Sequence, residues 1–291
     1  MGNCKSCCDL PPSPRSPPPQ VRDPSLFRLK LGSVIQFRDL ALVSHEAPVS
    51  PWASVHAGFY YGLPVLIKQL HRSDADVVQC FNCAVRLLVT LDHPNIVDFV
   101  GASLDAGPSI YMVTERLERG DLASILASNE EVSMQTSVSI MLDAARGMQY
   151  LLTLRPPVLH RNLHAGNVHV SADWRAKIAN FELYQTNAPS SPIETGFESQ
   201  RGDAELDEQA AVFSFYRVML HIIHREEPTS AFTEDNERRV DAAWPKALME
   251  LVDECGRRES AERPSFAHIV DELGRISIRM EMTLLDSAIV T

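Results

Sequence analysis

The sequence contains no uninterrupted apolar run of the ~18 residues that a membrane-spanning helix needs. Its first residues also lack the apolar core of a secretory signal peptide. Lysine and arginine are not clustered, and the net charge of -11 excludes the basic face with which general nucleic-acid-binding proteins contact phosphates. With 45% hydrophobic residues in 291 positions, the chain has enough apolar side chains for a full core. We therefore expect a soluble globular protein on the cytosolic side of a membrane.

The six cysteines give no disulfide framework, because three lie within the first eight residues and the others are scattered. Cys80 and Cys83 form a single C-x-x-C without a second ligand pair. We interpret them as two small residues on a helix face rather than as a redox pair or half a zinc site. Histidines are more numerous, but zinc requires three or four converging ligands and no such spacing is present. No metal site is assigned to the histidines, which include His160, His164, His169, His221 and His224.

The first eight residues, MGNCKSCC, carry a targeting signal. Gly2 and Ser6 fit the M-G-x-x-x-[ST] pattern for N-myristoylation, and three cysteines beside them are candidates for S-acylation: Cys4, Cys7 and Cys8. One myristoyl chain binds membranes only marginally, so acylated cysteines would supply the second signal that stable anchoring needs. A chance match to this short pattern is the alternative. The pattern predicts a lipid-anchored protein on the cytosolic face of a membrane, without a transmembrane segment.

Residues 1–34 are predicted to be a disordered tether. Residues 11–24 contain seven prolines and no apolar periodicity, which is typical of an extended linker. The P-x-x-P spacing within this stretch would also suit an aromatic groove, but the flanking arginines do not fall at the usual offsets. Residues 1–40 carry a net charge of about +3, which would help the segment lie on anionic lipid.

The pattern of apolar residues changes from β-like to helical along the rest of the chain. Short β-like runs (ALVSH, SVHAGFY, VLIKQL) precede a helix-like stretch at 74–91, and two further β-like runs follow, IVDFVGASL and IYMVTE. After Gly120 the apolar residues repeat at helical spacing. This order predicts an α+β, two-lobed domain over residues 35–275. Its small β-rich lobe covers about 35–116, its larger helical lobe about 117–275, and a C-terminal tail occupies 276–291.

Seven short motifs occur in a fixed order: VLIKQL at 65–70, HPNIV at 93–97, VTERLERGDL at 113–122, HRNLHAGN at 160–167, IANFE at 178–182, GFE at 196–198 and CGRRESAERPSF at 255–266. By their order and spacing they resemble the protein kinase family, especially its tyrosine-kinase-like branch, over residues 37–275. The resemblance implies a protein kinase-like fold. It also places Lys68 on the strand that carries the nucleotide lysine, and Thr114 at the gatekeeper position.

The resemblance also locates the positions that perform phosphoryl transfer, and several of them differ from the family pattern. Asn162 occupies the position of the catalytic aspartate, and a neutral amide cannot take a proton at neutral pH. Asn167 matches the metal-binding asparagine, but Asn180 replaces the aspartate of the metal-binding motif. Amides supply no negative charge to Mg²⁺. The glutamate partner of Lys68 maps to Ala84, and no acidic residue occurs between positions 77 and 91.

Nucleotide contacts are altered as well. The glycine-rich loop maps to Pro48, Ser50 and Ala53, so the backbone is not expected to approach phosphates closely. Leu66 replaces a small alanine above the adenine, and His169 replaces an apolar residue below it. We expect weak or absent ATP binding. A bound nucleotide would contact six residues: Lys68, Val55, Leu66, Thr114, Glu115 and His169.

Other positions that match the family are structural. His160, Phe181 and Leu88 match a stacked apolar spine between the lobes, whereas Glu198 and Arg263 match an ion pair that braces the helical lobe. Ala211 replaces the aspartate that anchors the catalytic loop from beneath. Arg161 is retained and would pair with a phosphate on the activation segment, at Ser190, Ser191 or Thr195. A solvent-facing arginine beside unmodified hydroxyls is the alternative.

From these differences we expect a pseudokinase that is not an enzyme and binds no cofactor. It would act as a membrane-tethered signalling scaffold or allosteric binding module, with protein partners that include an active kinase and with no nucleic acid. The alternative is a slow, divergent protein kinase for Ser/Thr or Tyr that uses ATP and Mg²⁺ through Lys68, Asn167 and Glu182.

Overall fold

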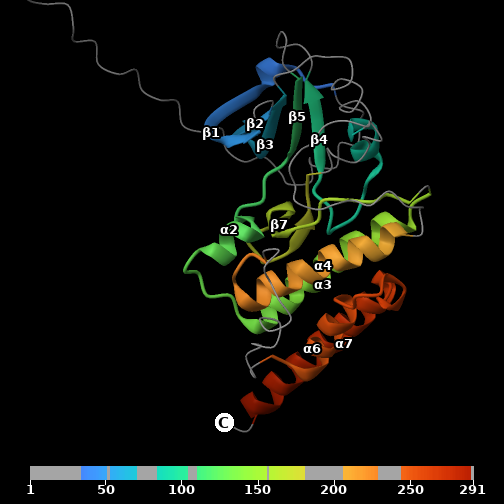
Figure 1. The fold of residues 1–291 in the computed structure, drawn as a ribbon. Coiled ribbons are helices and arrows are strands. Elements are labelled where there is room, and N and C mark those ends of the chain that lie inside the picture. The colour runs from blue at the N-terminus through green and yellow to red at the C-terminus, as the bar shows by residue number, and fades with distance from the viewer. Residues whose placement is uncertain are drawn as a thin grey trace, which may run out of the picture.

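A computed structural model describes residues 34–50, 53–70, 84–103, 110–155, 157–180, 206–228 and 244–289. These residues form two lobes, with a β-sheet lobe above a helical lobe in Figure 1. The arrangement confirms the predicted α+β class and the predicted two lobes. Within the described residues, no helix has both the length and the apolar composition that a membrane span requires.

The N-terminal lobe is built on an antiparallel sheet with the strand order β1-β2-β3-β5-β4. Its strands are β1 (Leu40–Ser50), β2 (Ala53–Tyr60), β3 (Leu63–Leu70), β4 (Phe99–Ser103) and β5 (Ile110–Glu115). A short 3-10 helix, η2 (Phe37–Asp39), precedes β1. Buried and half-buried side chains alternate along β3 because successive residues of a strand face opposite sides of the sheet. Each of the five β-like runs of the sequence overlaps one of these strands.

One helix of this lobe lies against the sheet. Residues 84–91 of the expected 74–91 stretch are described, and residues 84–90 are helical. Ala84 and Leu88, four positions apart on one face of this helix, are both buried in the main core. The remainder of the predicted stretch lies outside the described residues.

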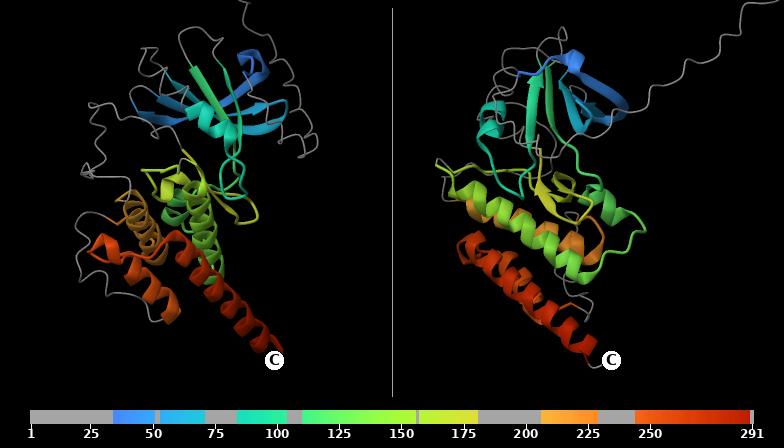
Figure 2. Two further views of the ribbon diagram at one scale, coloured as in Figure 1. Left: turned by 90° about the vertical axis from the view of Figure 1, so that its right-hand side faces the viewer. Right: turned by 180° about the vertical axis from the view of Figure 1, so that it is seen from behind.

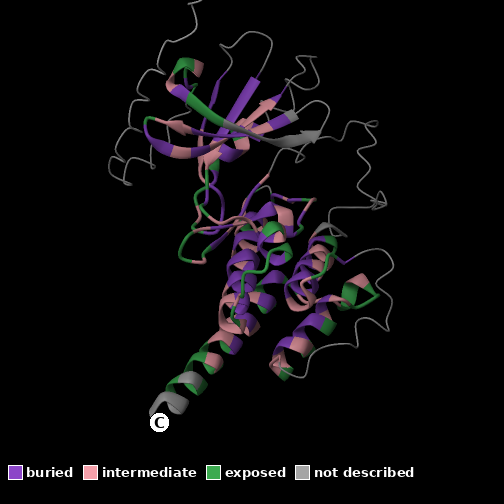
Figure 3. Ribbon diagram, turned by 90° about the vertical axis from the view of Figure 1, so that its left-hand side faces the viewer, coloured by how far each residue is buried: buried purple, intermediate pink, exposed green. Residues whose placement is uncertain are grey.

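The C-terminal lobe is helical, with a small sheet on the side that faces the other lobe. Its helices are α2 (Leu122–Ala127), α3 (Met134–Thr153), α4 (Leu206–His224), α6 (Lys246–Cys255) and α7 (Phe266–Ile289). The sheet consists of β6 (Gly120–Asp121), β7 (Val168–Val170) and β8 (Ala176–Ile178). Two 3-10 turns complete the lobe, η3 (Ala165–Asn167) and η5 (Ser260–Glu262). The central helix α3 is buried along most of its length, as Figure 3 shows.

Helix α7 continues through position 276, where the sequence analysis placed the start of a tail. No proline or glycine interrupts residues 275–289, so nothing in the sequence stops the helix. Ile276 is buried, and Gln135 of α3 donates from Nε2 to the Ser277 hydroxyl at 3.3 Å. The last turns of α7 project from the lobe (Figure 2). The expected boundary therefore falls inside a helix.

The two lobes are joined where the segment before β4 lies along β8. The Val97 amide donates to the Ile178 carbonyl at 2.9 Å, and the Ile178 amide donates to the Asn95 carbonyl at 2.9 Å. The Asn95 side chain also donates to the Ala176 carbonyl at 3.0 Å. These bonds bring the sheet of the N-terminal lobe next to β7 and β8, and the candidate site lies at this junction.

Candidate functional site

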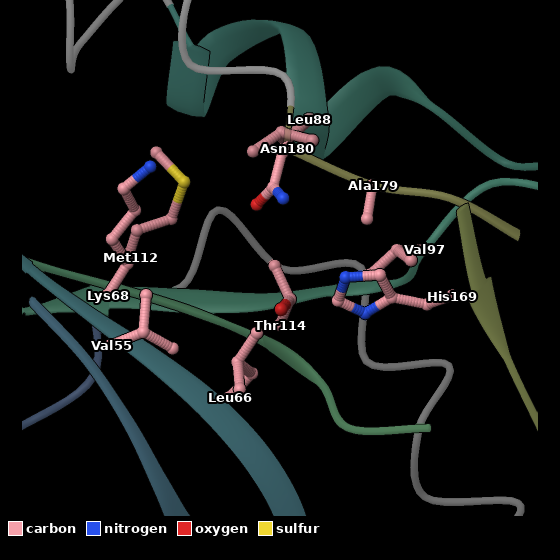
Figure 4. A pocket seen from close by; sticks show the side chains of 10 residues that line it. All are labelled: Val55, Leu66, Lys68, Leu88, Val97, Met112, Thr114, His169, Ala179 and Asn180. Carbon is pink, nitrogen blue, oxygen red and sulfur yellow. The ribbon is translucent and has the colours of Figure 1, made fainter. Parts of the chain in front are cut away.

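A pocket lies between the sheet of the N-terminal lobe and the β7–β8 hairpin, as Figure 4 shows. It is lined by Val55, Leu66, Lys68, Leu88, Val97, Met112, Thr114, His169, Ala179 and Asn180. The cavity measures about 30 Å³. Ligand sites of ordinary size have volumes of ~300–1,000 Å³, so a nucleotide would enter only after lining side chains had moved.

Most of the nucleotide-contact residues expected from the sequence meet in this pocket. Lys68 and Leu66 project from β3, Val55 from β2, Thr114 from β5 and His169 from β7 (Figure 4). Leu66 is half-buried, in the position where the sequence analysis expected it to crowd an adenine.

Three lining residues were not found from the sequence: Val97, Met112 and Ala179. Met112 lies directly opposite Lys68 in the pairing of β3 with β5, and this register would have identified it. Ala179 immediately precedes Asn180, and Val97 ends the HPNIV motif. Sequence neighbours of the motif residues were therefore the available signal.

Glu115 does not line the pocket. Its carboxylate accepts the Asp98 amide at 2.7 Å and lies 2.5 Å from the Lys177 ammonium nitrogen. Burial raises the pKa of the Glu115 carboxyl, and the positive charge of Lys177 opposes that rise. The side chain therefore faces β8. Only the backbone of Glu115 would be available to contact a nucleotide.

The residue expected to orient Lys68 is an alanine. Ala84 is buried, at 3% exposed, within the helical residues 84–90. A methyl group thus occupies the position where the family pattern has a glutamate. Residues 84–90 contain no acidic side chain that a small shift of register could bring into its place.

Three asparagines form a hydrogen-bonded chain beside the pocket. Asn180 donates from Nδ2 to Asn167 Oδ1 at 2.6 Å, and Asn167 donates from Nδ2 to the Asn162 carbonyl oxygen at 2.8 Å. A carboxylate at position 180 could not donate to Asn167 Oδ1, and the two facing oxygens would leave room for a cation. The Asn180 amide instead donates to Asn167 directly, so the two side chains satisfy each other without a cation.

This donor set fits Mg²⁺ poorly. Magnesium takes hard oxygen ligands, usually carboxylates together with phosphates, and the asparagine chain has no negative charge. Asn167 is buried, and the oxygen of its side chain already accepts a hydrogen bond. Within the described residues, moreover, no three His, Cys, Asp or Glu side chains gather in a way that could hold a metal ion.

Two residues near the pocket, one in the HRNLHAGN motif and one in the IANFE motif, have left-handed backbone conformations. Arg161 and Asn180 have positive φ angles of 52° and 63°, a conformation that asparagine tolerates better than arginine. His160 is 2% exposed, and its Nε2 lies 2.7 Å from the Ala179 carbonyl oxygen. The buried imidazole therefore links the loop to the end of β8. Ala211, in place of the anchoring aspartate, lies buried in α4.

The remaining structural predictions divide between described and undescribed residues. Leu88 is 4% exposed and lines the pocket. Arg263 donates to the carbonyl oxygens of Arg257 and Gln209, at 2.8 and 3.0 Å, and its guanidinium lies 4.7 Å from the Phe213 ring centroid. Other predicted positions lie outside the described residues: Gly2, Cys4, Cys7, Cys8, Phe181, Glu182, Ser190, Ser191, Thr195 and Glu198.

Comparison with known proteins gives a consistent set of similarities. Residues 51–200 match the family described as protein tyrosine and serine/threonine kinase. Serine/threonine-protein kinase 12 of Arabidopsis thaliana is 33% identical over 241 residues, which cover 74% of this chain and 52% of that protein. The probable serine/threonine-protein kinase SIS8 of the same plant is 28% identical over 258 residues, covering 80% of this chain and 25% of that protein. The probable serine/threonine-protein kinase kinX of Dictyostelium discoideum is 29% identical over 280 residues, covering 88% of this chain and 25% of that protein. The chain thus spans about half the length of the first relative and a quarter of the other two.

These relatives correct one expectation. The altered positions led us to expect a protein that is not an enzyme, and that expectation is wrong, because the relatives are named serine/threonine-protein kinases at up to 33% identity. The expectation rested on three missing carboxylates and an altered glycine-rich loop taken together. Losing a positioned general base typically costs ~10²- to 10⁴-fold in rate, which slows a reaction without abolishing it.

Proposed function

Since this chain belongs to the protein kinase family, we propose that it is a divergent protein kinase of the tyrosine-kinase-like branch that transfers phosphate slowly. The observation that carries the proposal is the hydrogen bond between Asn180 and Asn167, which replaces a charged metal-binding pair by two neutral amides. The match to the family of tyrosine and serine/threonine kinases supports the protein kinase part of this proposal, and the motif order along the chain is what favours the branch.

The pocket retains part of the chemistry that phosphoryl transfer needs. Kinases rely on positioning and on electrostatic stabilisation of the phosphates, and Lys68 lines the pocket as a cation. His169 supplies an aromatic ring on the opposite wall (Figure 4). Against this, Asn162 cannot take a proton at neutral pH, and Ala84 cannot orient Lys68. We therefore expect phosphate transfer at a low rate.

Restoring the carboxylates tests the proposal directly. We expect Asn180→Asp, alone and combined with Asn162→Asp, to raise ATP-dependent phosphotransfer by about 10²-fold or more, because a charged ligand and a base return to their positions. Transfer of radiolabelled phosphate from ATP to the chain itself and to a generic substrate such as myelin basic protein would be measured.

Two variants serve as controls. Asn180→Ala removes the amide without adding charge, and Lys68→Met removes the cation that faces the phosphates. The proposal requires Asn180→Asp to exceed Asn180→Ala and requires Lys68→Met to abolish the gain. Equal rates for the aspartate and alanine variants would overturn it.

We further infer that the kinase works on the cytosolic face of a membrane, where its protein partners, an active kinase among them, would be encountered. Support comes from the M-G-x-x-x-[ST] pattern at Gly2 and from the cysteines at positions 4, 7 and 8. We expect Gly2→Ala to move the chain from the membrane fraction of cells to the cytosol. Substitution of all three cysteines by serine should weaken retention, because a single myristoyl chain anchors only marginally. Unchanged fractionation of Gly2→Ala would refute the anchor.

A further inference from the structure

Three charged residues meet where the two lobes join, at Asp98, Glu115 and Lys177. The Lys177 ammonium nitrogen lies 2.5 Å from Glu115 Oε1 and 3.5 Å from Asp98 Oδ2. The side chains of Lys177 and Glu115 are 16% and 14% exposed, so most of this pair is shielded from water. Glu115 ends β5, Asp98 precedes β4 and Lys177 lies in β8, so the cluster spans both lobes.

Backbone bonds reinforce the N-terminal side of this cluster. The Asp98 amide donates to Glu115 Oε1 at 2.7 Å, and the Glu115 amide donates to the Asp98 carbonyl at 2.9 Å. One carboxylate oxygen of Glu115 therefore accepts from the backbone of the segment before β4 and from Lys177 of β8. A change in the position of any of these three segments would break at least one of the bonds.

Each member of the cluster is next to a residue that lines the pocket. Asp98 follows Val97, and Glu115 follows Thr114. Lys177 lies directly opposite His169 in the pairing of β7 with β8. We propose that Asp98, Glu115 and Lys177 form an interlobe latch that sets the width of the nucleotide pocket. The latch fixes the β7–β8 hairpin against the end of β5 and the segment before β4, which together we call the hinge.

The energetics favour a positioning role over a stabilising one. Because burial raises the pKa of Glu115 in spite of the adjacent ammonium group, holding this carboxylate in its charged form lowers the stability of the fold rather than raising it. Buried ion pairs are in general poor stabilisers, but removal of one partner leaves an uncompensated charge. The latch thus fixes a geometry, and Lys177 acts on the pocket through its neighbours rather than by touching a ligand.

The inference rests on the proposed function, in which a nucleotide occupies this pocket, so the test includes a measurement made without a nucleotide. The full chain would carry Lys177→Met, or Lys177→Met together with Glu115→Gln. Arg175→Met is the matched control. It breaks an ion pair next to the same strand, in which Arg175 Nη2 lies 2.9 Å from Asp143 Oδ1, but it leaves the hinge untouched.

Hydrogen exchange of the Asp98 and Glu115 amides is the first readout. We expect Lys177→Met to speed their exchange by about tenfold or more, and Arg175→Met to leave them unchanged, because only the former releases the hinge from β8. The double variant should recover global stability, since the only charge left unpaired is the Asp98 carboxylate, which is 44% exposed to water. It should not recover amide protection, because the side-chain link from Lys177 of β8 to Glu115 and Asp98 is still missing.

Affinity for ATP, measured by calorimetric titration, is the second readout. In the double variant it should fall by about tenfold or more relative to the unmodified chain. If the unmodified chain binds no ATP, the proposed function fails, and hydrogen exchange still decides on the latch. The latch would be overturned if the double variant regained its stability and both amides also exchanged as slowly as in the unmodified chain. An ion pair with a purely structural role would give that result.

Discussion

At position 180, one amide nitrogen takes the place of one carboxylate oxygen, and the site becomes neutral. The Asn180 side chain satisfies Asn167 by a direct hydrogen bond, so the pair is complete without a cation. An aspartate in the same place would set a carboxylate oxygen against Asn167 Oδ1, and a bound metal ion would stabilise these two facing acceptors. A single substitution therefore moves this site between a self-contained polar pair and a metal-binding one.

Leu66 is the other side chain that limits the site. It lines the pocket from β3, opposite Thr114 in the strand pairing. We expect Leu66→Ala to raise ATP affinity by roughly tenfold, equivalent to ~1.4 kcal/mol, because removal of the branched side chain makes room for the base. Calorimetric titration would measure the change, with the volume-conserving Leu66→Met as control. A loss of affinity in Leu66→Ala would mean that the leucine supports the base rather than crowding it.

Motif spacing was sufficient to locate candidate site residues, both those that match the family pattern and those that differ from it. Asn162, Asn167, Asn180 and His169 were located in this way, and the last two do line the pocket. Spacing could not show that Asn180 and Asn167 bond to each other, since that depends on rotamers and on the positive φ of Asn180. It also could not show that Glu115 faces away from the pocket, because the lysine that holds it lies 62 positions further along the chain.

Among the described elements, β8 contacts several parts of the candidate site. It pairs with β7, it is bridged to the HPNIV segment through Ile96 and Ile178, and it leads directly into Ala179 and Asn180 of the pocket. Lys177 adds the ion pair to the hinge. A three-residue strand of this kind carries a weak sequence signal, so its importance emerges only from tertiary contacts.

The HPNIV turn gives this protein a specific pH dependence. The His93 ring stacks on Tyr150 of α3 with centroids 4.7 Å apart, and its Nδ1 accepts the Asn95 amide at 3.1 Å. The pKa of His93 is lowered from 6.5, by burial first and by the charge of Arg146 second, with Asp92 opposing. Protonation at Nδ1 would place two N–H groups against each other.

Proton linkage gives the direction in which stability changes with pH. Below about pH 6.5 the unfolded chain binds a proton at His93 more readily than the folded chain does, so the free energy of unfolding falls as the pH falls. We expect His93→Gln to lose less stability between pH 7.5 and pH 5.5 than the unmodified chain loses, as measured by urea denaturation. A residual slope should remain, because burial also lowers the pKa of His164, His221 and His224. Identical pH profiles of the two chains would contradict this assignment.

Across the whole molecule, the fold could be predicted with more certainty than the activity. Alternating and helical apolar patterns are local, and they gave the β-rich lobe, the helical lobe and their order. Activity depends on the relative position of the lobes and on how much rate each altered residue removes, which no local pattern contains. That is why the expectation of an inactive protein failed against relatives named as kinases.

The most direct measurement is a thermal-shift titration of the full chain with ATP, with and without Mg²⁺, beside the same titration of Asn180→Asp. For the unmodified chain we expect a small shift that does not depend on Mg²⁺, because the neutral Asn180–Asn167 pair offers a metal no charge. For Asn180→Asp we expect a metal-dependent shift, approaching ~2.7 kcal/mol of stabilisation at 100 times the dissociation constant. A large Mg²⁺-dependent shift in the unmodified chain would contradict the claim that this site has exchanged its metal-binding charge for a hydrogen bond.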